Sequence, residues 1–156
     1  MRRISSLVLV GALLAAGCSA TVTSPSPTPA APVRVSVVQN PTFAGGMAVF
    51  TLRVENISQS VVDLTFPSSC QVLPYFTDRA TGRAVTPLGG GFACLTVMTR
   101  QTLGPGESFF RTHSVKSGTA HESDVIVLPP GDYTIRARLE DTVYKLNSEP
   151  VVFTVR

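Results

Sequence analysis

The thiol most open to modification in this chain is that of Cys18. Arg2 and Arg3 give the chain a positive start, and residues 4–16 form an apolar stretch that is too short to span a bilayer as a helix. Small residues lead from this stretch directly into Cys18, and a cysteine placed after such a cleavage site can be acylated. The pattern therefore predicts that residues 1–17 are removed as a signal peptide and that Cys18 carries a lipid.

An ordinary secretory signal followed by a chance cysteine is the alternative. Lipoprotein signals usually have leucine three residues before the cysteine, whereas here Ala15 holds that position and Leu14 stands one place earlier. Lipidation would hold the mature chain outside the cytoplasm, anchored to a membrane. Ser19 is not the aspartate that commonly retains lipoproteins at an inner membrane, so the outer membrane is favoured in a cell that has two.

Cys70 and Cys94 remain as one pair if Cys18 is lipidated. In an oxidising compartment such a pair persists as a disulfide, and closing a loop of about 25 residues would stabilise the fold by roughly 3 kcal/mol. Two free buried thiols or a metal site are the alternatives. Two cysteines without a nearby Cys-x-x-Cys or clustered histidines make a poor zinc site. We therefore expect a Cys70–Cys94 disulfide.

The two histidines, His113 and His121, are the other candidates for chemistry. With Glu122 and Asp124 they could form a metal site or an acid–base pair. However, His121 lies in the polar segment GTAHESD, which is typical of a solvated loop. We therefore expect no metal site here, and no cofactor.

Nucleophilic catalysis is not indicated either. A serine nucleophile needs an activating base and a strained, exposed position, and neither Ser68-Ser69 nor Ser108 has that context. The triple glycine Gly89, Gly90 and Gly91 lacks the Lys-Ser/Thr of a phosphate loop. It is interpreted as a hairpin connection, or alternatively as a loop that touches a partner with Phe92 as its anchor.

Charge and length set further bounds. Removing 17 of the 156 residues leaves about one domain. The formal charge of +3 includes Arg2 and Arg3, so 11 basic and 10 acidic side chains remain in the mature chain, a net of +1. No run of Lys or Arg survives, which excludes a clustered basic surface for nucleic acid. Residues 18–32 are rich in Pro, Ser and Thr and predict an extended tether on the order of 40 Å long.

The elements that position these residues are predicted to be strands over residues 33–156. Apolar residues alternate with polar ones in residues 50–54, 62–66, 133–139 and 151–155, with Gly/Pro turns between the runs. No stretch shows a helical period with caps. The pattern predicts an all-β, antiparallel β-sandwich. Its expected core contains Phe50, Leu52, Val54, Leu64, Phe66, Tyr133, Ile135 and Val155.

Two local motifs refine this picture. Asn56-Ile57-Ser58 fits a glycosylation sequon, but we interpret it as a turn. The sequence Pro130-Gly131-Asp132-Tyr133 suits a turn that feeds a strand, and it resembles a tyrosine corner.

Six segments carry a resemblance to a known family: FTLRVEN, VVDLTFPSSCQ, PYFTDRATGRAV, GGGF, TLGPGES and PPGDYTIRARL. In order and spacing they resemble the intracellular proteinase inhibitor (BsuPI) family. The resemblance implies an immunoglobulin-like β-sandwich and inhibition of serine proteases. Cys70 and Cys94 are additions to the family pattern. Tryptophans that members usually carry are missing from this chain.

The resulting hypothesis is a protein that binds a protein partner and is not an enzyme. A serine-protease inhibitor or regulator is favoured, and a non-inhibitory envelope structural or interaction module is the alternative. Contacts with the partner are expected at the apolar-tipped turns Phe66-Pro67 and Leu73-Pro74, and at the Gly89–Gly91 segment with Phe92.

Overall fold

The computed structural model describes residues 30–38, 41–88, 92–122 and 125–156. Strands are the only regular secondary structure in those ranges. Among the same residues there is no helix long and apolar enough to cross a membrane. The predicted signal peptide and the lipidated Cys18 lie outside the described residues.

The first sheet is built around β3 (Met47–Asn56). One edge of β3 pairs with β1 (Val33–Val37) and β2 (Thr42–Ala44), and the other edge pairs with β8 (Ser108–Ser117). These pairs are antiparallel. The short strand β9 (Ile126–Leu128) instead runs parallel to β8. All three of its residues are buried, so it shows no alternation that would mark it as a strand.

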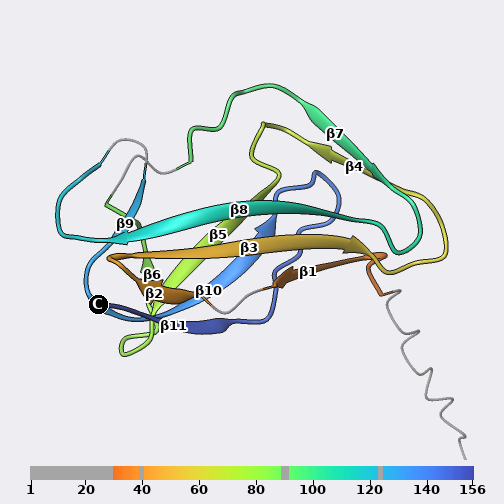
Figure 1. Cartoon of the computed structure of the whole chain (residues 1–156). Coiled ribbons are helices and arrows are strands. Elements are labelled where there is room, and N and C mark those ends of the chain that lie inside the picture. Colours follow the sequence, from red (N-terminus) through yellow and green to blue (C-terminus); the bar gives the residue numbers. More distant parts are fainter. Residues whose placement is uncertain (1–29, 39–40, 89–91, 123–124) are drawn as a thin grey trace, which may run out of the picture.

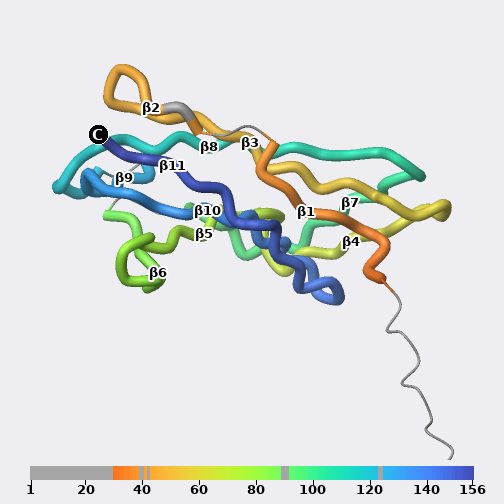
Figure 2. The backbone as a smooth tube through the Cα atoms, turned by 90° about the horizontal axis from the view of Figure 1, so that it is seen from below, coloured from red at the N-terminus to blue at the C-terminus, as the bar shows by residue number. Residues whose placement is uncertain are grey.

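The second sheet has the order β11-β10-β5-β6 and is antiparallel throughout. Its strands are β5 (Val72–Asp78), β6 (Ala84–Val85), β10 (Gly131–Leu139) and β11 (Val151–Val155). A separate antiparallel pair, β4 (Val62–Phe66) with β7 (Thr99–Leu103), extends at one end of the molecule (Figure 1). Figure 2 shows the layers after a turn of 90°, with β3 and β8 along one side and β5 and β6 along the other.

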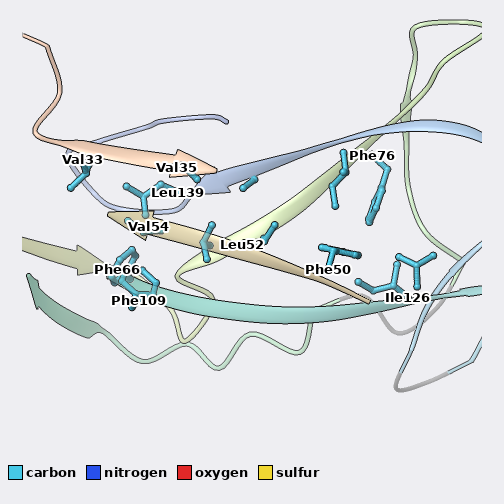
Figure 3. Packing of buried hydrophobic residues seen from close by; sticks show 14 of the residues in the cluster. Val33, Val35, Phe50, Leu52, Val54, Phe66, Phe76, Phe109, Ile126 and Leu139 are labelled. Atoms are coloured by element: carbon cyan, nitrogen blue, oxygen red, sulfur yellow. The ribbon is translucent and has the colours of Figure 1, made fainter. Parts of the chain in front are cut away.

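The core fills the space between these layers. All eight residues that the alternation assigned to the core are buried, and Phe50, Leu52 and Leu64 have no exposed surface. Burying such a side chain stabilises the fold by roughly 1.5–3 kcal/mol. Figure 3 shows how the buried side chains spread along the whole sandwich, from Phe66 and Phe109 at one end to Phe50, Phe76 and Ile126 at the other. The predicted all-β sandwich is confirmed, while its immunoglobulin-like subtype stays a prediction.

Tyr133 holds the start of β10 in the way that the sequence suggested. Its hydroxyl donates a hydrogen bond to the carbonyl oxygen of Pro129, four residues earlier, at 2.9 Å. The ring lies against Gly131, where an added Cβ would come within 3.3 Å of the tyrosine hydroxyl oxygen. A side chain at position 131 would crowd the ring, and the Pro-Gly-x-Tyr motif is a structural device.

Asn56 organises the end of the molecule where β3 ends. The residue is fully buried, and its side-chain nitrogen donates to the carbonyl oxygens of Ser60, Leu103 and Gly104 at 2.7, 2.9 and 3.1 Å. Its Oδ1 accepts from the main-chain N–H and the hydroxyl of Ser58 at 2.9 and 2.8 Å. These contacts bind the turn after β3 to the turn between β7 and β8, and they leave no room for a glycan.

Candidate functional site

The site is built on the Cys70–Cys94 disulfide, which the structure confirms. The two Cα atoms lie 5.3 Å apart, within the range that a bridge requires. Cys70 follows β4 and precedes β5, whereas Cys94 lies in the irregular segment that leads into β7. The bridge therefore binds this segment to the chain that joins the β4–β7 pair to the second sheet.

Four consecutive residues after Cys94 stand out from the fold. Leu95, Thr96, Val97 and Met98 are all exposed, and the apolar members are 69%, 49% and 65% accessible for Leu95, Val97 and Met98. We call them the Leu95–Met98 loop. Figure 1 shows this part of the chain as the green trace that runs along the outside of the molecule into β7. Apolar side chains so exposed in one short loop are typical of a surface that contacts another protein.

The first end of the Leu95–Met98 loop is fixed by main-chain hydrogen bonds. The N–H of Leu95 donates to Ser69 Oγ at 2.9 Å, and its carbonyl oxygen accepts from the N–H of Ser69 at 3.0 Å. The same carbonyl oxygen also accepts from the N–H of Val97 at 2.8 Å. Together with the neighbouring disulfide, these bonds hold the loop entrance against the Ser68–Gln71 segment.

The second end of the Leu95–Met98 loop is also fixed against the Ser68–Gln71 segment. The Thr99 hydroxyl donates to the carbonyl oxygen of Ser68 at 3.0 Å, and Nε2 of Gln71 donates to the Thr99 oxygen at 3.2 Å. Thr99 also begins β7 and pairs with Phe66 of β4. The loop is therefore clamped at both ends onto one short piece of chain.

Phe92 connects the irregular segment before β7 to the core. Its ring meets the His113 ring edge to face at a centroid distance of 5.3 Å, and His113 stacks on Phe50 at 5.8 Å. A continuous aromatic contact thus runs from the segment into the core. Burial lowers the pKa of His113, and the positive charge of Arg111 acts in the same direction, while a hydrogen bond with the backbone of Val72 opposes both.

The His113 side chain serves as a packing residue. Its Nε2 is buried, and within the described ranges it has no hydrogen-bond partner. A neutral ring is the form that suits this apolar setting. His121 is exposed, and its neighbour Glu122 forms an ion pair with Lys116 at 2.6 Å. The described residues contain no group of three or more His, Cys, Asp or Glu side chains that could hold a metal ion.

A pocket of about 270 Å³ lies beside Phe92. It is bounded by strands β5 and β6 and by the chain that follows β6, and its lining residues are Leu73, Pro74, Tyr75, Phe76, Val85, Thr86, Pro87 and Phe92. Arg138 lies over the ring of Tyr75, with its guanidinium carbon 3.9 Å from the ring centroid. The pocket adds an apolar surface beside Phe92, and none of its lining residues belongs to the Leu95–Met98 loop.

The partner contacts predicted from the sequence need two corrections. Phe66 is fully buried and packs edge to face on Phe109 at 6.3 Å, so it belongs to the core and offers no contact surface, although Pro67 beside it is exposed. Leu73 and Pro74 lie within strand β5 instead of forming a turn, and Pro74 is buried. Gly89, Gly90 and Gly91 lie outside the described residues. Phe92 is half-buried and supports the site from below.

The Leu95–Met98 loop was not predicted from the sequence. A partial signal was present: directly after a cysteine expected to be bridged, Leu95, Val97 and Met98 are apolar, and Met98 is out of phase with the alternation that leads into β7. Apolar residues that fit no strand pattern are candidates for contact with another protein.

Comparisons with known proteins bear on the whole domain. The family model described as BsuPI, intracellular proteinase inhibitor, matches residues 34–144. The comparison with curated proteins gave no match.

Among solved structures, β-glucosidase 3B from Thermotoga neapolitana is similar at 15% identity and a TM-score of 0.42, over 79% of this chain and 16% of that one. A β-glucosidase from Kluyveromyces marxianus is similar at 12% identity and a TM-score of 0.43, over 80% of this chain and 14% of that one. This chain thus spans less than a fifth of either enzyme. Likenesses this distant bear on neither its fold nor its function.

Proposed function

The chain belongs to the intracellular proteinase inhibitor (BsuPI) family, and on that premise we propose that it is a lipid-anchored inhibitor of a serine proteinase outside the cytoplasm. The family description names an inhibitor and not an enzyme, which agrees with a protein that acts by binding a proteinase. The target class, the compartment and the anchor are the parts that we add to it.

The observation that carries the proposal is the Leu95–Met98 loop, clamped at both ends. A proteinase cleft takes up an exposed, extended piece of chain. A loop already held in one conformation loses less entropy on binding than a flexible substrate does, so it binds more tightly. Both clamps of this loop hold it to the Ser68–Gln71 segment. A cut within the loop would therefore leave both new ends in place, and the domain would be released slowly.

Two features support the proposed compartment. The Cys18 motif, with the short apolar stretch before it, is typical of lipoprotein signals. The Cys70–Cys94 disulfide is typical of proteins in an oxidising compartment. The Pro-rich residues 19–32 would hold the inhibitory domain away from the membrane surface, where it could meet proteinases that attack envelope proteins.

Inhibition is tested with the full chain, solubilised in detergent and added to chymotrypsin, subtilisin and trypsin. We expect saturable loss of activity of at least one of these enzymes at low micromolar inhibitor, with the chain still intact by mass spectrometry when inhibition is complete. The matched control is the chain with both Cys70 and Cys94 replaced by serine, which should be degraded as a substrate. Rapid cleavage of the unaltered chain without inhibition of any enzyme would favour the non-inhibitory envelope module.

The anchor is tested separately. The intact mass of the protein from the membrane fraction should show loss of residues 1–17 and added acyl mass on Cys18. Replacing Cys18 with serine should release the protein into the soluble fraction. A mature chain that starts at another residue would contradict the anchor without affecting the inhibitory role.

A further inference from the structure

The Leu95–Met98 loop offers two residues that could enter the primary specificity pocket of a serine proteinase. Leu95 and Met98 are its most exposed apolar side chains, at 69% and 65%. A serine proteinase also binds the main chain of the residue in that pocket, because its oxyanion hole receives the carbonyl oxygen at the bond under attack. The residue that enters the pocket must therefore have main-chain groups that are free to bind.

Leu95 does not meet this requirement. Its N–H donates to Ser69 Oγ, and its carbonyl oxygen accepts from the N–H groups of both Ser69 and Val97. A proteinase would have to break these bonds to bind the Leu95 main chain. Leu95 therefore belongs to the support of the loop.

Met98 meets the requirement. Within the described part of the chain, neither its N–H nor its carbonyl oxygen makes a main-chain hydrogen bond. The register of β4 with β7 accounts for the free carbonyl oxygen. Continuing from the Phe66–Thr99 pair, Pro67 comes opposite Met98, and proline has no N–H to donate. Among the described strands, β7 pairs only with β4, so its other edge is open to a partner.

Building on the proposed function, we propose that Met98 is the residue that enters the primary pocket, that Met98–Thr99 is the bond presented to the catalytic serine, and that the target proteinase has an apolar primary pocket. Thr96 and Val97, both exposed, precede Met98 and would contact the neighbouring subsites. Met98 has the length and flexibility to fill a deep apolar pocket.

The support of Thr99 explains why such a bond would be cut slowly. In acyl transfer the serine oxygen bonds to the Met98 carbonyl carbon, the Met98–Thr99 bond breaks, and the serine proton passes to the Thr99 nitrogen. The Thr99 side chain is hydrogen-bonded to Ser68 and Gln71, and its main chain pairs with Phe66. The new amine therefore stays beside the acyl group, where the peptide bond can re-form before water enters.

The test exchanges the specificity of the pocket residue. With the full chain in detergent, Met98→Lys should weaken inhibition of chymotrypsin at least about 30-fold, because a charged side chain would enter an apolar pocket unpaired. The same variant should gain inhibition of trypsin, whose pocket accepts Lys. Met98→Leu should stay within about tenfold of the parent. The matched control is Met47→Lys, at an exposed methionine in the hairpin of β2 and β3.

The two proposals fail differently. If the parent chain inhibits chymotrypsin and Met98→Lys changes the inhibition of neither chymotrypsin nor trypsin, Met98 does not enter the pocket, while the inhibitory function stands. If the parent inhibits no serine proteinase and Met98→Lys inhibits no trypsin, the proposed function itself fails. A second readout locates the bond: after prolonged incubation with the enzyme, the fraction of the chain that is slowly cut should carry a new amino terminus at Thr99, and a new terminus at Thr96 would overturn the assignment in favour of Leu95.

Discussion

Replacing Asn56 with alanine should destabilise the whole domain, although Asn56 contributes no apolar surface to the core. Its side chain connects two turns through hydrogen bonds to the carbonyl oxygens of Ser60, Leu103 and Gly104, and it accepts two more from Ser58. Alanine can replace none of them. The substitution therefore removes the side-chain link between the end of β3 and the turn between β7 and β8, and only the main-chain bonds of Asn56 with Gly106 and Glu107 remain.

The magnitude follows from the burial of the groups that lose their partner. A net contribution of about 0.5 kcal/mol for each of the five hydrogen bonds, the lower end for such bonds, and a further cost of about 1–3 kcal/mol if the buried Leu103 carbonyl oxygen stays unpaired, give a loss of about 3.5–5.5 kcal/mol. Water can reach the less buried groups, which favours the lower half of this range. A small domain is stable by only about 5–15 kcal/mol, so the loss should be plain in any unfolding curve.

Urea unfolding followed by circular dichroism measures this loss, because the chain has no tryptophan to report by fluorescence. The midpoint should fall and the slope should stay the same. Asn147→Ala, at an exposed asparagine, is the matched control and should change stability by less than about 0.5 kcal/mol. A loss below about 1 kcal/mol for Asn56→Ala would refute the assignment of a connecting role to this side chain.

Three further changes test other parts of the structure. Replacing both Cys70 and Cys94 with serine should cost about 3 kcal/mol of unfolding free energy, because the unfolded chain regains the freedom that the bridge removes, and an unchanged urea midpoint would contradict this. Asp141→Ala should lower the free energy of unfolding, measured by thermal unfolding, by about 2–4 kcal/mol, because the buried carboxylate accepts three main-chain N–H bonds, one of them from β4. A loss below about 1 kcal/mol would contradict a stabilising role for this carboxylate. Burial lowers the pKa of His113 from its ordinary value of 6.5, so the unfolded chain binds a proton more tightly than the folded one. The free energy of unfolding should therefore fall as the pH drops below 6.5 and level off beneath the pKa of His113 in the folded chain. His113→Phe should flatten this fall, and an equal fall in the variant would refute the assignment of this pH dependence to His113.

The fold was predictable because alternation reports burial directly. In β3 and β10 a residue faces either the core or the solvent, and Phe50, Leu52 and Tyr133 all lie where the period of two puts them. The same rule could not predict β9, which is buried at all three positions and runs parallel to β8. For a strand without alternation, pairing depends on tertiary contacts that a local pattern does not contain.

The site was only half predictable for a related reason. The Cys70–Cys94 bridge followed from compartment and cysteine count, but the identity of the exposed apolar residues depends on where strands begin and end. Phe66 and Pro67 are neighbours in sequence, yet the first is the last buried residue of β4 and the second is exposed. The exposure of the Leu95–Met98 loop arises from its clamps to Ser69 and Ser68, which are long-range hydrogen bonds with no signature in the local sequence.

Titration of chymotrypsin activity with the full chain, with and without Met98→Lys, tests the inhibitory loop most directly. The parent chain should inhibit in competition with substrate, at a stoichiometry of one chain per enzyme, and should be recovered uncleaved at Met98–Thr99 or cut only slowly there. The variant should lose this inhibition and gain inhibition of trypsin. Unhindered chymotrypsin, subtilisin and trypsin activity together with rapid cleavage of the parent within the loop would show that the loop is a substrate, and the inhibitory function would be contradicted.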